Sequence, residues 1–160
     1  MTSTAKAVPD ATPTIQAYIC VRGAAAAIDF YKRAFGAIEI MARISDGTGR
    51  VGHAEIRVGD SVVMMADEHP EFGFVSPQSL GGCPVLFVVN VPDVDAAAAR
   101  AVAAGGRLTR PVENQFYGNR TGEITDPFGY RWHLSTHVED VPEEEIARRF
   151  AAREKSRAGG

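Results

Sequence analysis

The chain has 160 residues, enough for one compact domain with a hydrophobic core. Its net charge is -3 and its pI about 5.8, so the composition lacks both the basic surface of a nucleic-acid-binding protein and a cationic face for a membrane. No run of about 18 apolar residues is present, which argues against a membrane-spanning helix.

The two cysteines, Cys20 and Cys83, indicate a reducing environment. They are far apart and have the spacing of neither a disulfide framework nor a zinc knuckle. Both lie in apolar runs, where we expect buried thiols. The first residues, "MTSTAKAVPDATP", contain no apolar segment of the kind that a secretory signal requires. We therefore expect a cytoplasmic protein.

In chain order, the first half predicts a strand, a helix and three more strands. Residues 1–13 are polar, contain two prolines and are expected to form a flexible arm. Residues 14–21 alternate as a half-buried strand does. An apolar stripe over residues 24–35 then predicts a helix that ends at Gly36. Glycine-containing turns separate the three following strands, expected at 38–44, 51–58 and 61–66.

The second half repeats this order. Residues 83–91 are almost continuously apolar, which is typical of a strand buried on both faces. Asp93 can cap a helix that stops at Gly105-Gly106. Three more strands are expected, at 107–112, 120–125 and 130–136, with Asp126-Pro127-Phe128-Gly129 as the last turn.

The two halves form an internal repeat of one βαβββ unit. Val21 corresponds to Val91 at an offset of 70, and Asp60-Ser61 to Gly129-Tyr130 at 69. We predict an α+β fold in which tandem modules, at residues 14–82 and 83–137 of one compact domain, form a curved sheet that lines a cavity. A generic α+β domain with coincidental spacing is the alternative.

Residues 138–160 are expected to form a C-terminal helix and tail. Glu143 to Glu145 open the helix and arginines crowd its far end, an arrangement that complements the helix dipole. Ile146 and Phe150 give it a narrow apolar stripe, so the helix is expected to dock on its own domain or on a partner subunit rather than on a membrane.

Several motifs resemble those of the vicinal oxygen chelate superfamily, which includes glyoxalase I, bleomycin-resistance proteins, fosfomycin-resistance enzymes and extradiol dioxygenases. The strongest are "AAIDFYKRAFGA" and "TDPFGYRWHL". "HAEIRVGDSVVMMADE" and "QFYGNRTG" are most similar to the glyoxalase- and bleomycin-resistance-like branch. The resemblance covers Thr14 to about His137 and implies the fold more specifically than the activity.

In metal-using members, the resemblance implies four inward-pointing ligands from the first, fourth, fifth and eighth strands. The matching positions here are Gln16, Met64, Leu86 and His133. The internal repeat pairs the same positions, 16 with 86 and 64 with 133. Leucine offers no donor atom and a thioether is a poor ligand for zinc, nickel, iron or manganese, so we expect no bound metal and no other cofactor. A register shifted by one or two residues would bring in His53, Glu55 or Asp67, and a divalent metal stays open as an alternative.

His133 is instead expected to be a polar group in a mostly apolar ligand cavity, with Glu123 nearly opposite it; a solvent-facing histidine is the alternative. His53, Glu55 and Arg57 share a strand face that forms either an acid/base pair or a solvated surface. Met64 and Met65 suit either a ligand-binding wall or the core. The loop Asn114 to Arg120 mixes aromatic, amide and cationic groups and could bind a planar ligand or form a structural turn. The residues expected to bind ligand are Gln16, Tyr18, Met64, Leu86, Gln115, Tyr117, Arg120 and His133.

Three functions remain open from the sequence. The first is a metal-free protein of the bleomycin-resistance type that binds an organic molecule, aromatic or antibiotic-like, in a cavity at a homodimer interface. The second is a glyoxalase-like lyase or isomerase, with or without a metal, in which His133 or Glu55 moves a proton. The third is a structural or binding homodimer whose cavity has lost its role. No nucleic acid or membrane partner is expected.

Overall fold

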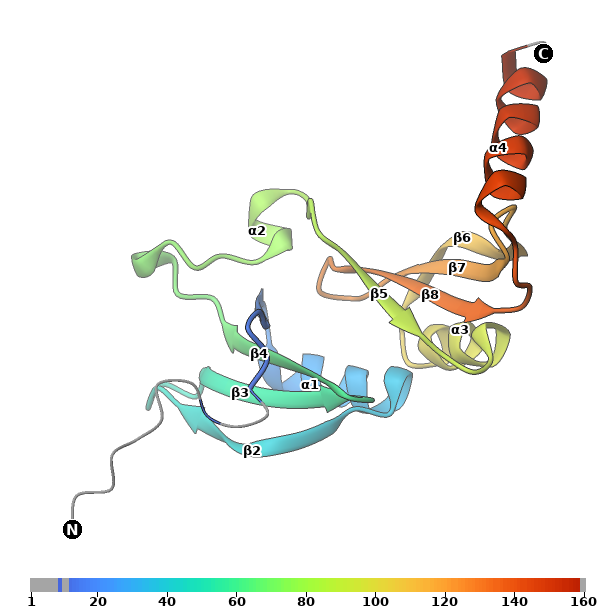
Figure 1. Ribbon diagram of the computed structural model, residues 1–160. Helices are drawn as coiled ribbons and strands as arrows, with labels where there is room; N and C mark the ends of the chain where they lie inside the picture. Colours follow the sequence, from blue (N-terminus) through green and yellow to red (C-terminus); the bar gives the residue numbers. More distant parts are fainter. Residues whose placement is uncertain (1–8, 10–11, 159–160) are drawn as a thin grey trace.

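The computed structural model describes residue 9 and residues 12–158. The flexible arm expected over residues 1–13 lies almost wholly outside the described residues. Within the described part, no helix is both long enough and apolar enough to cross a membrane. Residues 12–158 form two four-stranded mixed sheets with one long helix packed on each and a further helix at the C-terminus (Figure 1).

The two sheets have the same strand order, as the repeat predicts. The first module has the order β1-β4-β3-β2 and the second the order β5-β8-β7-β6. The elements of the first module are β1 (Ala17–Val21), α1 (Ala24–Phe35), β2 (Ile38–Ser45), β3 (Val51–Val58) and β4 (Ser61–Asp67). Those of the second are β5 (Leu86–Asn90), α3 (Val94–Ala103), β6 (Arg107–Asn114), β7 (Asn119–Thr125) and β8 (Arg131–His137). The α+β tandem fold is therefore confirmed.

Strand pairing reproduces the offsets of the sequence repeat. Tyr18 of β1 lies opposite Met64 of β4, and Val88 of β5 lies opposite His133 of β8. These pairs are related by offsets of 70 and 69, as predicted from the sequence. Each sheet thus has an inner face, which carries its helix, and an outer face, on which Tyr18, Met64, Val88 and His133 lie.

The modules pack through their inner faces. In Figure 1, α1 and α3 lie between the two sheets, and these helices contact each other. The buried core runs across both modules. Within it, the ring of Trp132 lies 5.3 Å from that of Tyr31 and 4.9 Å from that of Phe35. The outer faces consequently point away from each other, so one chain alone does not close a cavity between them.

The turn between β7 and β8 joins the modules through the buried carboxylate of Asp126. Its Oδ2 accepts hydrogen bonds from the Tyr31 hydroxyl, at 2.7 Å, and from Trp132 Nε1, at 2.8 Å. Its Oδ1 accepts from the backbone N–H groups of Phe128 and Tyr130. A helix of the first module and a strand of the second are therefore held by one side chain.

Three expectations about the strands and thiols are corrected. Residues 14–16 are not part of β1, because its ladder with β4 begins at the pair Ala17–Val63. β5 is not buried on both faces: on the outer face Val88 is 60% exposed and Leu86 is 40% exposed. Cys20 is buried as expected, whereas Cys83 is only half-buried.

A connector to which the sequence analysis assigned no structure joins the modules. It contains the 3₁₀ helix η1 (Pro70–Phe72) and the short helix α2 (Pro77–Leu80). Glu68 organises it by accepting hydrogen bonds from the backbone N–H and hydroxyl of Ser76 and from the hydroxyl of Ser79. Arg22 pairs with the other carboxylate oxygen at 3.2 Å. This network fixes the path of the chain over one end of the first sheet.

The C-terminal helix α4 (Glu143–Ala158) is confirmed, and it projects from the second module (Figure 1). It is attached at its middle: Arg149 pairs with Glu139 at 2.8 Å, and the Phe150 ring lies 5.6 Å from that of Phe116. None of the helix residues is buried. Its apolar stripe therefore docks on its own domain only in part.

Candidate functional site

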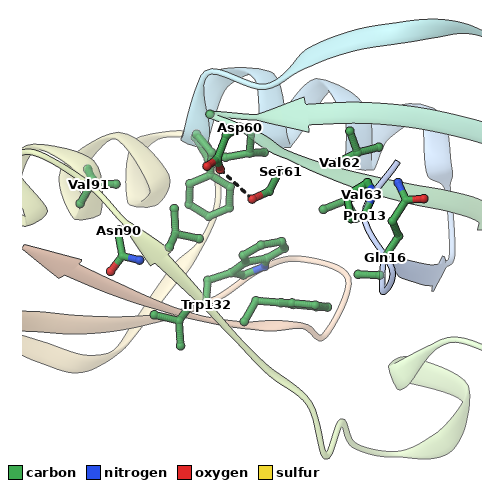
Figure 2. Close-up of a pocket in the computed structure, with 18 of the residues that line it drawn as sticks. Pro13, Gln16, Asp60, Ser61, Val62, Val63, Asn90, Val91 and Trp132 are labelled. Atoms are coloured by element: carbon green, nitrogen blue, oxygen red, sulfur yellow. Dashed lines mark hydrogen bonds between the residues drawn. The ribbon is translucent and has the colours of Figure 1, made fainter. Parts of the chain in front are cut away.

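A cavity of about 960 Å³ lies between the two modules (Figure 2). Val62 and Val63 border it from β4, and Asn90 and Val91 from the end of β5; Trp132 contributes its aromatic ring. Gln16 is the only member of the expected ligand-binding set to line this cavity within the described residues. Its polar borders also include Ser61, whose hydroxyl donates to Asp60 at 2.9 Å.

A second pocket, of about 420 Å³, lies on the outer face of the second sheet and contains His133. Gln115 and Tyr117, which follow β6, lie in the same pocket. The remaining lining residues are Arg110, Pro111, Glu113, Thr121, Gly122, Arg153 and Arg157. Three residues expected to bind ligand are thus brought together, in surroundings with more arginines than carboxylates.

Glu123 lies opposite His133 across the β7–β8 ladder, as expected. Its carboxylate does not bond the imidazole, however. It accepts from Arg131 Nε at 2.9 Å and lies 3.7 Å from Arg110 Nε, and the hydrogen bond from Arg131 holds the pKa of Glu123 below its ordinary value. Glu123 is therefore engaged by arginines, and His133 keeps its imidazole nitrogens for other partners.

The outer face of the first sheet carries the corresponding row of residues. Tyr18, Met64 and Glu55 lie side by side on β1, β4 and β3, where the second sheet has Val88, His133 and Glu123. The Tyr18 hydroxyl is 2.8 Å from His53 Nδ1, and His53 Nε2 is 3.2 Å from Glu55 Oε1. The pair His53 and Glu55 seen in the sequence is thus part of a longer hydrogen-bonded chain.

The expected ligand-binding residues divide among separate surfaces. Tyr18 and Met64 lie on the outer face of the first sheet; Leu86 and His133 lie on that of the second. Met65, by contrast, is a core residue with no exposed surface. Arg120 does not join His133: it lies on the inner face and pairs with Asp95 of α3, with Arg120 Nε 2.7 Å from Asp95 Oδ2. Because side chains alternate between the faces of a strand, Arg120 points away from the pocket that contains His133.

The four positions implied for a family-type metal do not form a suitable donor set. Gln16 borders the cavity between the modules, while Met64 and His133 lie on the outer faces of different sheets. Among them, only imidazole is a common ligand of transition metals. In residues 12–158, no three His, Cys, Asp or Glu side chains gather closely enough to hold a metal ion.

Asp67, one of the alternative ligands, has a different task. Its Oδ1 accepts hydrogen bonds from the backbone N–H groups of Gly23 and Ala24 at 2.8 Å, and its Oδ2 accepts one from Val51 N at 2.8 Å. The carboxylate therefore caps the start of α1 from a neighbouring strand. Of the alternative metal ligands, only His53 and Glu55 then remain as a pair of neighbouring donor groups.

An aromatic group in the connector was missed in the sequence. Phe72, Phe74 and His69 lie beside Tyr18, and Tyr18 and Phe74 make an edge-to-face contact at 5.5 Å between ring centroids. The signal was the density of aromatic residues in "DEHPEFGF". It was not interpretable alone, because only the fold returns this connector to the edge of β1.

Fold and sequence comparisons agree on the class of protein. The family model described as "Glyoxalase/Bleomycin resistance protein/Dioxygenase superfamily" matches residues 14–134. The chain therefore belongs to this superfamily, and the predicted family resemblance is confirmed.

Similar proteins occur in bacteria and plants. An uncharacterised protein of Mycobacterium tuberculosis is 39% identical over 137 residues, which cover 84% of this chain and 80% of that protein. The X-ray structure of an Arabidopsis thaliana gene product is 30% identical, with a TM-score of 0.63 over 80% of this chain and 99% of that one. TioX from a Micromonospora species matches in fold at a TM-score of 0.60 and 24% identity, covering 79% of this chain and 100% of that one.

Proposed function

We propose that this protein binds a small organic molecule on the outer faces of its sheets without the help of a metal. The observation that carries this proposal is the meeting of His133, Gln115 and Tyr117 in one pocket. Imidazole, amide and phenol groups are polar contacts of the kind that orient a ligand in such sites. The four family ligand positions support a metal-free mode, since leucine and methionine occupy two of them.

The charges around His133 favour a ligand with an acidic group. Arg110, Arg153 and Arg157 line the pocket with one carboxylate, that of Glu113, and Glu123, opposite His133, lies 3.7 Å from Arg110 Nε. Guanidinium groups bind carboxylates and phosphates through paired hydrogen bonds. We expect the rest of the ligand to be apolar, because Val88 lies next to His133 across the ladder.

A second copy of the chain is proposed to complete the site. The outer faces expose Tyr18, Ile44, Leu86 and Val88, which in a monomer would remain in contact with water. A symmetric homodimer could cover these faces and enclose the ligand between them. A reducing location such as the cytoplasm suits the two free thiols, Cys20 and Cys83.

The test is a thermal-shift screen of organic acids and antibiotics, followed by calorimetric titration of each compound that raises the melting temperature. His133→Ala should weaken binding by roughly threefold to a hundredfold, the range for loss of one neutral or charged hydrogen bond. His137→Ala is the matched control, because this histidine ends the same strand and is instead bonded to Asp140 and Asn119. Equal affinity of wild type and His133→Ala would contradict the proposal.

A further inference from the structure

An aromatic pocket of about 440 Å³ opens on the outer face of the first sheet. It belongs to the first module, whereas His133 belongs to the second. Its lining residues are Tyr18, Gly52, Ala66, His69, Phe72 and Phe74. Gly52 and Ala66 are small and leave room above the strands, whereas the other four side chains supply rings. Tyr18 and Phe74 stand edge to face, with ring centroids 5.5 Å apart, and His69 and Phe72 lie 6.3 Å apart. Such walls suit a planar aromatic ring.

Phe72 is the least expected of these rings, because its residue surface is 82% exposed. It ends η1, whose connector is tied down by Glu68 through Ser76 and Ser79. The ring is therefore held in water next to a hollow by an ordered segment. Covering an exposed aromatic ring removes apolar surface from water, so a ligand in the pocket would be stabilised by contact with Phe72.

The hydrogen-bonded chain at Tyr18 shows which polar group the ligand should carry. An ionised Glu55 only accepts hydrogen bonds, so in a neutral His53 imidazole the single proton lies on Nε2, 3.2 Å from Glu55 Oε1. His53 Nδ1 then has a free lone pair and accepts the Tyr18 hydroxyl hydrogen at 2.8 Å. With its own hydrogen donated, the Tyr18 oxygen can only accept a bond from a ligand.

The environment keeps Tyr18 in this donating state. Partial burial, with the negative charge of Glu55 as a further cause, raises the pKa of Tyr18 above its ordinary value. The phenol therefore stays protonated at neutral pH and keeps its bond to His53. Tyr18 is 43% exposed and lines the pocket, so a ligand there can contact it.

We propose that this pocket binds a hydroxyaromatic group, with the ring between Tyr18 and Phe72 and the ligand hydroxyl donating a hydrogen bond to the Tyr18 oxygen. Ligand access to this outer face rests on the proposed function. The chain Tyr18–His53–Glu55 selects for a donor on the ring, because a ligand oxygen without hydrogen would face an oxygen that has no hydrogen left to give.

The experiment titrates the full chain with 1-naphthol and 1-methoxynaphthalene, which share the ring system and differ in the hydroxyl hydrogen. Wild type should bind 1-naphthol roughly three- to tenfold more tightly, as expected for one neutral hydrogen bond. Tyr18→Phe should abolish this preference while retaining the ring. Phe72→Ala should weaken binding of both probes, and Phe150→Ala, which removes an exposed aromatic ring from α4, should change neither. Melting curves establish that each variant is folded.

Equal affinity of wild type for the two probes, or a preference that survives in Tyr18→Phe, would overturn the hydroxyaromatic subsite. So would binding that is unaffected by Phe72→Ala. Failure here is distinct from failure of the proposed function. If a screened acid binds in a His133-dependent manner while the naphthalenes show no preference, only the aromatic subsite is wrong. If the preference holds and no screened compound depends on His133, the subsite stands without the proposed role of His133.

Discussion

Asp126 is the residue of the β7–β8 turn that bonds to both modules. Its two oxygens receive two side-chain and two backbone hydrogen bonds, in a position that is 4% exposed. The sequence identified the turn from Asp126-Pro127-Phe128-Gly129 but could not identify the bond to Tyr31, 95 residues away. Local turn chemistry is readable from adjacent residues, whereas a contact between modules depends on how they pack.

Replacement of Asp126 by alanine should destabilise the protein severely. Four donors would lose their acceptor, and a buried unsatisfied group costs about 1–3 kcal/mol. Even with partial rescue by water, we expect a loss of at least about 3 kcal/mol, or roughly 6–12 °C in melting temperature. Asp140→Ala is the control, since that carboxylate is fully exposed. A change of only a degree or two in Asp126→Ala would show that the turn does not hold the modules together.

Adjacent residues on β8 should respond in opposite ways to substitution. Trp132 is 3% exposed in the core, so Trp132→Ala should cost roughly 3–5 kcal/mol. His133 lies on the other face and makes no contact with the core, so His133→Ala should change stability by no more than about 0.5 kcal/mol. Urea unfolding of both variants measures the two values. A similar loss in both would place His133 among the core residues.

At the scale of elements, the connector was the least predictable part of the chain. Its η1 and α2 are three and four residues long, too short for a hydrophobic period to indicate them. The long helices and the eight strands of residues 12–158 were predicted because their alternation and end signals are local. One expectation that failed, burial of β5 on both faces, concerned what covers an element, which composition alone does not decide.

The network that holds the connector should make stability depend on acid pH. Hydrogen bonds from Ser79 and Ser76, and then the Arg22 contact, lower the pKa of Glu68 from its ordinary value of 4.5 to about 2. Since the folded pKa is depressed, the stabilisation is fully present above pH 4.5 and is lost as the pH falls toward 2. Glu39 and Glu145, each with a pKa lowered to about 2 by their basic partners, act in the same direction.

Glu68→Gln isolates the contribution of the connector. The variant should be less stable than wild type at pH 7, and the gap should narrow between pH 4.5 and pH 2, as wild type loses its ionised Glu68. Ser79→Ala, which removes one of the donors, should give an intermediate pH dependence. Urea unfolding at a series of pH values is the measurement, and parallel curves for wild type and Glu68→Gln would refute the assignment.

For the whole molecule, the chemistry of the donor residues predicts a protein without a stoichiometric transition metal. The side chains at two of the four family ligand positions, Met64 and Leu86, provide no good donor, and the adjacent pair His53 and Glu55 offers only two. Protein purified without a metal-affinity tag should contain well under one zinc, nickel, iron or manganese per chain by elemental analysis. A value close to one would mean that the ligand register inferred from the repeat is wrong.

The outer faces of both sheets carry exposed apolar residues and end in unpaired strands within residues 12–158. β1 and β5 each pair with a single strand within residues 12–158, so each has a free edge. Exposed apolar residues lie on these edge strands, including Tyr18 of β1 at 43% and Val88 of β5 at 60% exposure. Free edges and uncovered apolar faces favour association, so sedimentation velocity at micromolar concentration should give a homodimer.

A charge placed at Val88 should break this dimer without unfolding the chain. Val88→Lys adds an ammonium group that water solvates in the monomer but that a covered face would have to desolvate. Its dimer dissociation constant should therefore rise at least about tenfold, equivalent to roughly 1.4 kcal/mol, while its melting temperature at low protein concentration should match that of wild type. Leu80→Lys is the matched control, because Leu80 is 67% exposed on α2, away from both sheets. Wild type that sediments only as a monomer would exclude the dimer, and a Val88→Lys protein that dimerises like wild type would place the interface elsewhere.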